Sequence, residues 1–106
     1  MSGSAFVLHP RLAADTLPIG RLGLSRLLLM NDASYPWLIL VPERPDIREI
    51  HELSVADRAL LIEEIALCSR ALADALAVDR AADKINVAAL GNVVAQLHVH
   101  IIARYA

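Results

Sequence analysis

Apolar runs separated by short polar segments divide the chain into stretches typical of strands and helices. Residues 24–30 and 37–41 are two such runs, and the Asn, Asp, Ser and Pro residues between them favour a turn. They predict a β-hairpin. Because the run at 37–41 has no polar alternation, we expect it at the centre of a sheet, buried on both faces. Near the N-terminus the pattern predicts a short edge strand at 6–8 and one helical turn at 10–14.

Residues 54–78 carry the long helical pattern of the chain, with Ser54 as the N-cap and Asp57 in the first turn. Apolar side chains recur at helical spacing along one stripe: Leu61, Ile65, Cys68, Leu72 and Leu76. The charged positions, Glu64 among them, are interpreted as a solvated face. This amphipathic helix needs one sheet face to cover.

Two more strands are predicted after the helix, at 84–90 and 94–104. The order of elements favours an α+β fold, in which an antiparallel sheet of about five strands carries one long helix on one face. Residues 1–106 are expected to form a single domain.

Charge and cysteine content narrow the class of protein. The chain has 10 Lys and Arg against 12 Asp and Glu, a formal net charge of −2, which disfavours a basic nucleic-acid binder. Its single cysteine allows no intramolecular disulfide, so a reducing cytoplasm is expected. No signal peptide is readable, and the uncharged stretch at 85–103 contains too many Asn, Gln and His residues for a membrane span.

Candidate chemistry lies on the last predicted strand. Strand alternation puts Gln96, His98 and His100 on one face, and the apolar residues between them on the face that the helix must cover. Buried polar side chains need partners, so three in a row indicate a cleft. The two imidazoles are expected roughly 7 Å apart, a spacing suited to the oxygens of one phosphate group.

The segment QLHVHII at 96–102 resembles the signature of the histidine-triad family, in which histidines alternate with apolar residues, with Gln96 in place of the first histidine. The hairpin closed by a proline, the helix and the closing strands resemble the family's element order over 24–104. The resemblance implies a nucleotide hydrolase or transferase in which His98 attacks the α-phosphorus and forms a nucleotidyl-histidine. It also implies that His98 Nδ1–H donates to a backbone carbonyl near position 96, while His100 and the Gln96 amide bind phosphoryl oxygens.

The same resemblance suggests residues for substrate binding. Asn31 is expected to hold the ribose hydroxyls, Leu29 and Met30 to line the base pocket, and Asn86 to lie near the phosphate. The implied partner is a nucleoside mono- or polyphosphate or a phosphoramidate, bound by a homodimer without a cofactor or a metal. Two positions depart from the family pattern, Pro45 where many members carry a histidine and Val93 where a serine can assist the leaving group. The source of the leaving-group proton therefore stays open. Nothing in the sequence selects the leaving group among amine, sulfate, phosphate and a second nucleotide.

The turn between the last two strands decides where Asn86 points. A two-residue loop of Gly91 and Asn92 would set Asn86 on the helix-covered face, where an unpartnered amide costs roughly 1 to 3 kcal/mol. An odd loop that includes Val93 sets Asn86 opposite His98. We expect the odd loop.

Two alternatives to an enzymatic function stay open, a binding or interaction module and a metal-binding protein. The departures from the family pattern suit a nucleotide-binding or interaction module without turnover, and an HxH pair can also bind a metal, although a third ligand at local spacing is missing. Trp37 and Cys68 are interpreted as core residues, and His9 and His51 as solvated side chains at turns.

Overall fold

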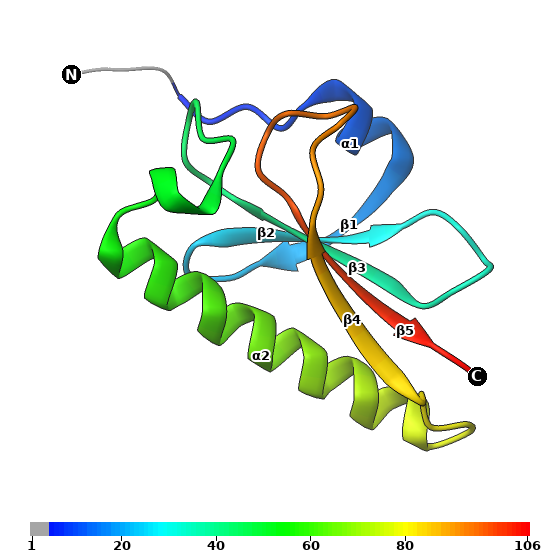
Figure 1. The fold of residues 1–106 in the computed structure, drawn as a ribbon. Helices are drawn as coiled ribbons and strands as arrows, with labels where there is room; N and C mark the ends of the chain where they lie inside the picture. The colour runs from blue at the N-terminus through cyan, green and yellow to red at the C-terminus, as the bar shows by residue number, and fades with distance from the viewer. Residues whose placement is uncertain (1–4) are drawn as a thin grey trace.

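The computed structural model describes residues 5–106 and contains a five-stranded antiparallel sheet with the order β1-β2-β3-β5-β4. Residues 1–4, which the sequence assigns to the same domain, lie outside this range. The strands are β1 (Thr16–Arg21), β2 (Ser25–Met30), β3 (Trp37–Pro42), β4 (Lys84–Ala89) and β5 (Val99–Arg104). The long helix α2 (Val55–Ala77) lies along one face, and the short helix α1 (Pro10–Asp15) lies on the other (Figure 1). The predicted fold class is confirmed, and β3 is the central strand.

Helix α2 forms where its cap and its apolar stripe predict it. The Ser54 side chain accepts a hydrogen bond from the Asp57 N–H, and Val78 is the C-cap residue. Leu61 and Cys68 enter a core with residues of β3 and β5. That core contains Leu24, Leu40, Leu53, Leu61, Cys68, Leu97, Val99 and Ile101. The apolar side of the last strand is therefore covered by the helix, as its alternation predicts.

A second, smaller core lies on the opposite face of the sheet. It consists of Leu12, Leu28, Ile39, Val41 and Val94, with Phe6, Leu8, Met30 and Trp37 packed against it. These side chains come from α1 and the segment before it, from the sheet, and from the loop at 90–98, which passes over this face beside α1 (Figure 1). The sheet thus has one face closed by a long helix and one face closed by short, irregular segments.

The N-terminal strand is not where the pattern places it. Residues 6–8 form no strand, and Phe6 and Leu8 instead pack into the smaller core. The edge strand on the N-terminal side of the sheet is β1, whose pairing with β2 shifts between Pro18 and Gly20. A proline and a glycine disguise this strand in the sequence, but both are tolerated at an edge, where one row of N–H groups has no ladder partner.

The last strand is shorter than predicted, because residues 94–98 belong to the loop and not to β5. The Leu97 N–H donates to the Ile47 carbonyl rather than to a neighbouring strand. Val94 is buried in the smaller core, which pulls the loop over the sheet. A 3₁₀ turn, η1 (Ile50–Glu52), lies between β3 and α2.

The expected register of the last hairpin is wrong. Asn86 pairs with Ile102, and Ala88 pairs with His100, because residues 90–98 form a long loop instead of a three-residue turn. Opposed residues share a face. Asn86 therefore lies on the same face as His100, as expected, but two residue pairs further along the sheet.

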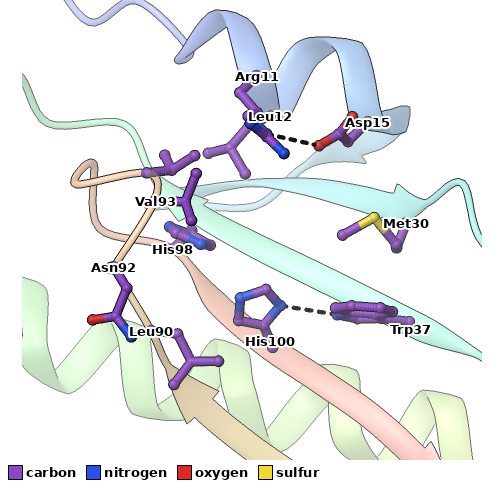
Figure 2. Close-up of a pocket in the computed structure, with 12 residues that line it drawn as sticks. Arg11, Leu12, Asp15, Met30, Trp37, Leu90, Asn92, Val93, His98 and His100 are labelled. Atoms are coloured by element: carbon purple, nitrogen blue, oxygen red, sulfur yellow. Dashed lines mark hydrogen bonds and ion pairs between the residues drawn. The ribbon is translucent and has the colours of Figure 1, made fainter.

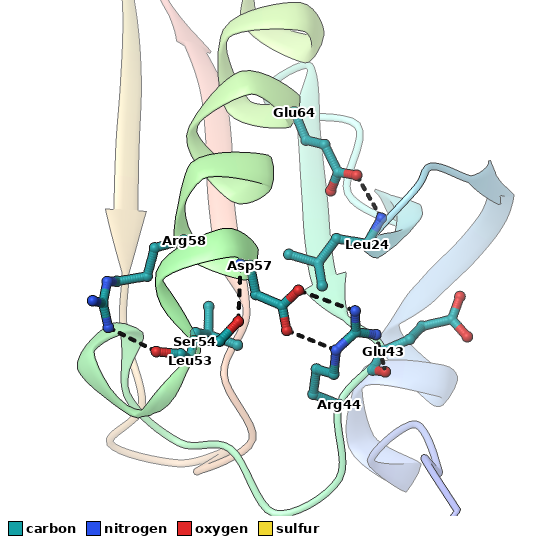
Figure 3. A network of polar contacts seen from close by, with 8 residues as sticks. All are labelled: Leu24, Glu43, Arg44, Leu53, Ser54, Asp57, Arg58 and Glu64. Carbon is teal, nitrogen blue, oxygen red and sulfur yellow. Dashed lines mark hydrogen bonds and ion pairs between the residues drawn. The ribbon is translucent and has the colours of Figure 1, made fainter.

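Glu64 lies on the buried side of α2 rather than on a solvated face. It is 7% exposed, and its Oε2 accepts a hydrogen bond from the Leu24 N–H at 2.7 Å (Figure 3). Its spacing of three residues from Leu61 and four from Cys68 puts it on the apolar stripe. Nearby, Arg44 makes a two-pronged ion pair with Asp57 at 2.7 and 3.1 Å, which joins the end of β3 to the first turn of α2.

Between residues 5 and 106, no helix combines the length and the apolar character needed to cross a bilayer.

Candidate active site

His98 lies immediately before β5 and is only 5% exposed. Its Nδ1 lies 2.7 Å from the backbone carbonyl oxygen of Gln96. A carbonyl can only accept, so Nδ1 carries the proton and, in the neutral ring, Nε2 keeps its lone pair. The expected backbone partner at position 96 is confirmed, and it leaves His98 with one available nucleophilic nitrogen.

His100 is oriented by a side chain rather than by the backbone. The indole Nε1–H of Trp37 donates to His100 Nδ1 at 2.9 Å (Figure 2). The centroids of the two rings are 5.5 Å apart. The His98 and His100 rings meet edge to face with centroids 4.9 Å apart. Burial, and secondly the neighbouring His98, lower the pKa of His100 below its ordinary value. His100 is therefore a neutral imidazole at pH 7, with its proton on Nε2.

The two histidines form the floor of a pocket of about 330 Å³. The loop at 90–94 lies on one side and α1 on another, with Trp37 and Met30 from the sheet completing the wall (Figure 2). Most of the wall is apolar. Its charged members are Arg11 and Asp15, which pair across one turn of α1 at 3.6 Å and are more than half exposed.

The Gln96 side chain does not enter this pocket, contrary to its expected role on a phosphoryl oxygen. Its Oε1 accepts from the His9 N–H and its Nε2 donates to the Val7 carbonyl, both at 2.8 Å. Because β5 begins only at Val99, strand alternation does not extend back to position 96. Gln96 instead fastens the segment before α1 to the loop that carries His98.

The four predicted substrate-binding residues are not brought together. Met30 lines the pocket, whereas Leu29 pairs with Leu38 and so lies on the helix-covered face. Asn31 is exposed and outside the pocket wall, although its N–H donates to the Asp15 carbonyl at the rim. Asn86 is exposed and lies in a separate depression with Lys84 and Arg104, on the histidine face but away from the histidines.

Several pocket residues are missing from the sequence-based site, among them Trp37, Arg11 and Asp15. Trp37 looks like a core residue in an apolar run, and its indole N–H reaches His100 only through the pairing of β3 with β5. Arg11 and Asp15 are spaced four apart on a helical turn, a local signal, but nothing in the sequence places that turn over the histidines. In the described chain, no three His, Cys, Asp or Glu side chains gather in a way that could hold a metal ion.

An antiparallel sheet with one long helix, and a nearly buried histidine pair at the start of its inner strand, define a histidine-triad fold. The HIT domain model matches residues 11–106, and the chain belongs to this family. Family membership supports a nucleotide-binding or a hydrolase/transferase module.

Solved structures agree with this assignment. A histidine triad protein from Bradyrhizobium japonicum is 53% identical, with a TM-score of 0.91 over 96% of this chain and 73% of that one. One from Sinorhizobium meliloti is 52% identical, with a TM-score of 0.89 over 94% of this chain and 71% of the other. One from Marinobacter aquaeolei is 47% identical, with a TM-score of 0.91 over 96% and 72% of the two chains. A comparison with curated proteins gave no match.

Proposed function

We propose that the chain is a nucleoside-phosphate hydrolase or nucleotidyl transferase that works through a nucleotidyl-histidine on His98. The observation that carries this proposal is the 2.7 Å contact between His98 Nδ1 and the Gln96 carbonyl. It leaves a lone pair on Nε2 without any need for a separate base. The pocket of about 330 Å³ over the histidines gives the substrate a place to bind.

The reaction has two displacements at phosphorus. His98 Nε2 forms a bond to the α-phosphorus, and the bond to the leaving group breaks with its electron pair on the departing atom. Water or another acceptor then attacks the same phosphorus and releases its proton to the solvent, the P–N bond breaks, and the electron pair of that bond returns to Nε2. The Nε2–H of His100 donates to a phosphoryl oxygen as negative charge grows there.

The test is detection of the covalent intermediate by intact mass after rapid mixing with adenosine 5′-(4-nitrophenyl phosphate), whose leaving group needs no proton. The guanosine ester is run beside it, since the choice of base is open. We expect a single nucleotidyl adduct that maps to His98 and is missing in His98→Asn. Tight nucleotide binding without any adduct from either ester would instead favour the binding module.

We also propose a homodimer. β4 is an edge strand of the sheet, and exposed apolar side chains lie on it and on α2, namely Val87, Leu60, Ile62 and Leu67. An edge strand and exposed apolar side chains suit a two-fold interface. Light scattering at micromolar concentration tests this, and a strictly monomeric mass would refute it.

A further inference from the structure

The hydrogen bond from Trp37 restricts what His100 can do in the reaction. An indole N–H is a donor and has no acceptor, so the nitrogen it meets, His100 Nδ1, must carry a lone pair. A protonated His100 would put a second N–H against the indole N–H at 2.9 Å. The bond therefore holds His100 in its neutral form with the proton on Nε2. A neutral imidazole donates a hydrogen bond from Nε2 but does not release that proton near pH 7.

The groups around His100 do not replace the missing acid. His98 faces it from the residues just before β5, Trp37 comes from β3, and Arg11 and Asp15 face the pocket from α1. His98 has its one proton on Nδ1, bonded to the backbone, and its Nε2 is the attacking atom.

The rest of the wall offers no acid either. The Arg11 guanidinium does not give up a proton, and Asp15 is paired with it. Among the remaining lining residues in the described part of the chain, Asn92 has an amide and the others have no acidic group. Val93, at the position where a serine can assist the leaving group, has an apolar side chain that is 73% exposed in the loop beside the histidines.

We propose that Trp37 is a positioning residue that keeps His100 from protonating the leaving group. The pocket then suits nucleotide substrates whose leaving group departs as an anion, such as phosphoanhydrides, rather than alkyl phosphoramidates. This proposal rests on the proposed function. Among the leaving groups that the sequence leaves open, the proposal favours those that depart as anions over amines.

The first displacement then needs no proton transfer. The P–N bond to His98 forms, the bond from phosphorus to the leaving oxygen breaks, and that oxygen keeps the electron pair as phosphate or a longer polyphosphate. Arg11 is the cation in the pocket wall, and its exposed pair with Asp15 is of the kind that contributes little to stability. The guanidinium can therefore exchange that carboxylate for the departing anion. An alkyl amine is a strong base and must be protonated before it leaves.

The decisive experiment uses the wild-type protein and adenosine 5′-aryl phosphates whose phenols differ in acidity, with an N-alkyl phosphoramidate of AMP beside them. The measured quantity is the rate of adduct formation on His98, by quenched mixing and intact mass. We expect the rate to fall roughly three- to tenfold for each unit by which the pKa of the phenol rises. We expect the phosphoramidate to react at least about 100-fold more slowly than the nitrophenyl ester, the size of a missing acid catalyst.

Trp37→Phe then separates positioning from packing, because it keeps an aromatic ring and removes the N–H. We expect a shallower dependence on the phenol, since His100 Nδ1 can now accept a proton and His100 can act as an acid. The ¹⁵N shifts of the His100 ring should change from one tautomer to a mixture. Phe6→Leu is the matched control: it removes an aromatic ring from the same small core without touching His100, and should leave the dependence steep.

The possible results separately test the missing acid, the role of Trp37 and the proposed nucleophile. If the wild-type rate is nearly independent of the phenol, or if the phosphoramidate reacts as fast as the nitrophenyl ester, the pocket does supply a proton and this inference is wrong, while the proposed nucleophile stands. If Trp37→Phe slows all substrates equally, Trp37 is only a packing residue. If even the nitrophenyl esters give no adduct, it is the proposed function that fails. The wild-type series needs no variant, so a Trp37→Phe protein that does not fold leaves the test intact.

Discussion

Two groups of buried side chains lie on opposite faces of the sheet around the start of the inner strand β5, and they are buried for different reasons. On the helix-covered face Val99 and Ile101 are at most 1% exposed and pack in the larger apolar core. On the other face His98 and His100 are 5% and 8% exposed, and each ring has one specific hydrogen bond to Nδ1. Burial therefore does not separate the functional face from the structural one. The hydrogen bonds do, because they leave one nitrogen of each ring directed into a pocket.

Glu64 shows that a buried polar side chain alone is not a site. It lies on the helix-covered side with one oxygen bonded to the Leu24 N–H, and it lines neither the histidine pocket nor the depression around Asn86. Its contact joins α2 to the start of β2. The histidines differ because α1 and the 90–98 loop leave space above them.

The largest expected effect is on the histidine face, from His98→Asn. Removing the nucleophile should lower adduct formation and turnover by at least about 10³-fold. The free energy of unfolding should change by only about 1 kcal/mol, since the side chain has one hydrogen bond. Stopped-flow release of nitrophenolate and denaturant melts measure the two quantities. Substantial turnover in this variant would remove His98 from its role.

The opposite outcome is expected on the helix face, from Leu40→Ala. This side chain is fully buried in the larger core, so its truncation should lower the free energy of unfolding by about 2 to 5 kcal/mol. The rate of the folded fraction should stay within about twofold of wild type, because Leu40 is not in the pocket wall. A rate loss as large as that of His98→Asn would show that the two faces are not independent.

A smaller effect is expected where the N-terminal segment meets the histidine loop. Gln96→Ala removes both hydrogen bonds to residues 7 and 9 and should cost about 1 to 3 kcal/mol of unfolding free energy. Amide exchange in the segment before α1 should accelerate. Gln96→Glu is the control, since it keeps the acceptor for the His9 N–H and loses the donor to Val7. Unchanged exchange in Gln96→Ala would mean that packing alone holds this segment.

The smallest effect concerns pH. Burial, followed by His98, lowers the pKa of His100 below 6.5, so the unfolded chain takes up that proton more readily than the folded one. The stability contribution of this group is complete above about pH 6.5 and decreases as the pH falls below it. Thermal melts between about pH 7.5 and pH 5.5 should show a steeper loss for wild type than for His100→Asn. Parallel losses would contradict a lowered pKa.

Local sequence patterns determined the long helix, the hairpin before it and the face of the sheet that the helix covers. The Ser54 cap and the apolar stripe predict the long helix within one residue at each end, and the turn residues at 31–36 predict the hairpin before it. The alternation of residues 97–101 predicts which face the helix covers. These signals depend on neighbours within a few positions, so the sequence displays them directly.

Tertiary structure alone decided the partners of the polar groups. Gln96 meets backbone 87 and 89 residues away, Trp37 meets His100 across 63 residues, and Glu64 meets Leu24 across 40. Strand alternation constrains the face of a side chain only while the strand lasts, and β5 begins too late to direct Gln96 into the pocket. Likewise, the length of the 90–98 loop set Asn86 opposite Ile102 rather than His98. The histidine pair can therefore be identified from the sequence. The hydrogen bonds that determine its chemistry cannot, because they join chain segments that are brought together only by folding.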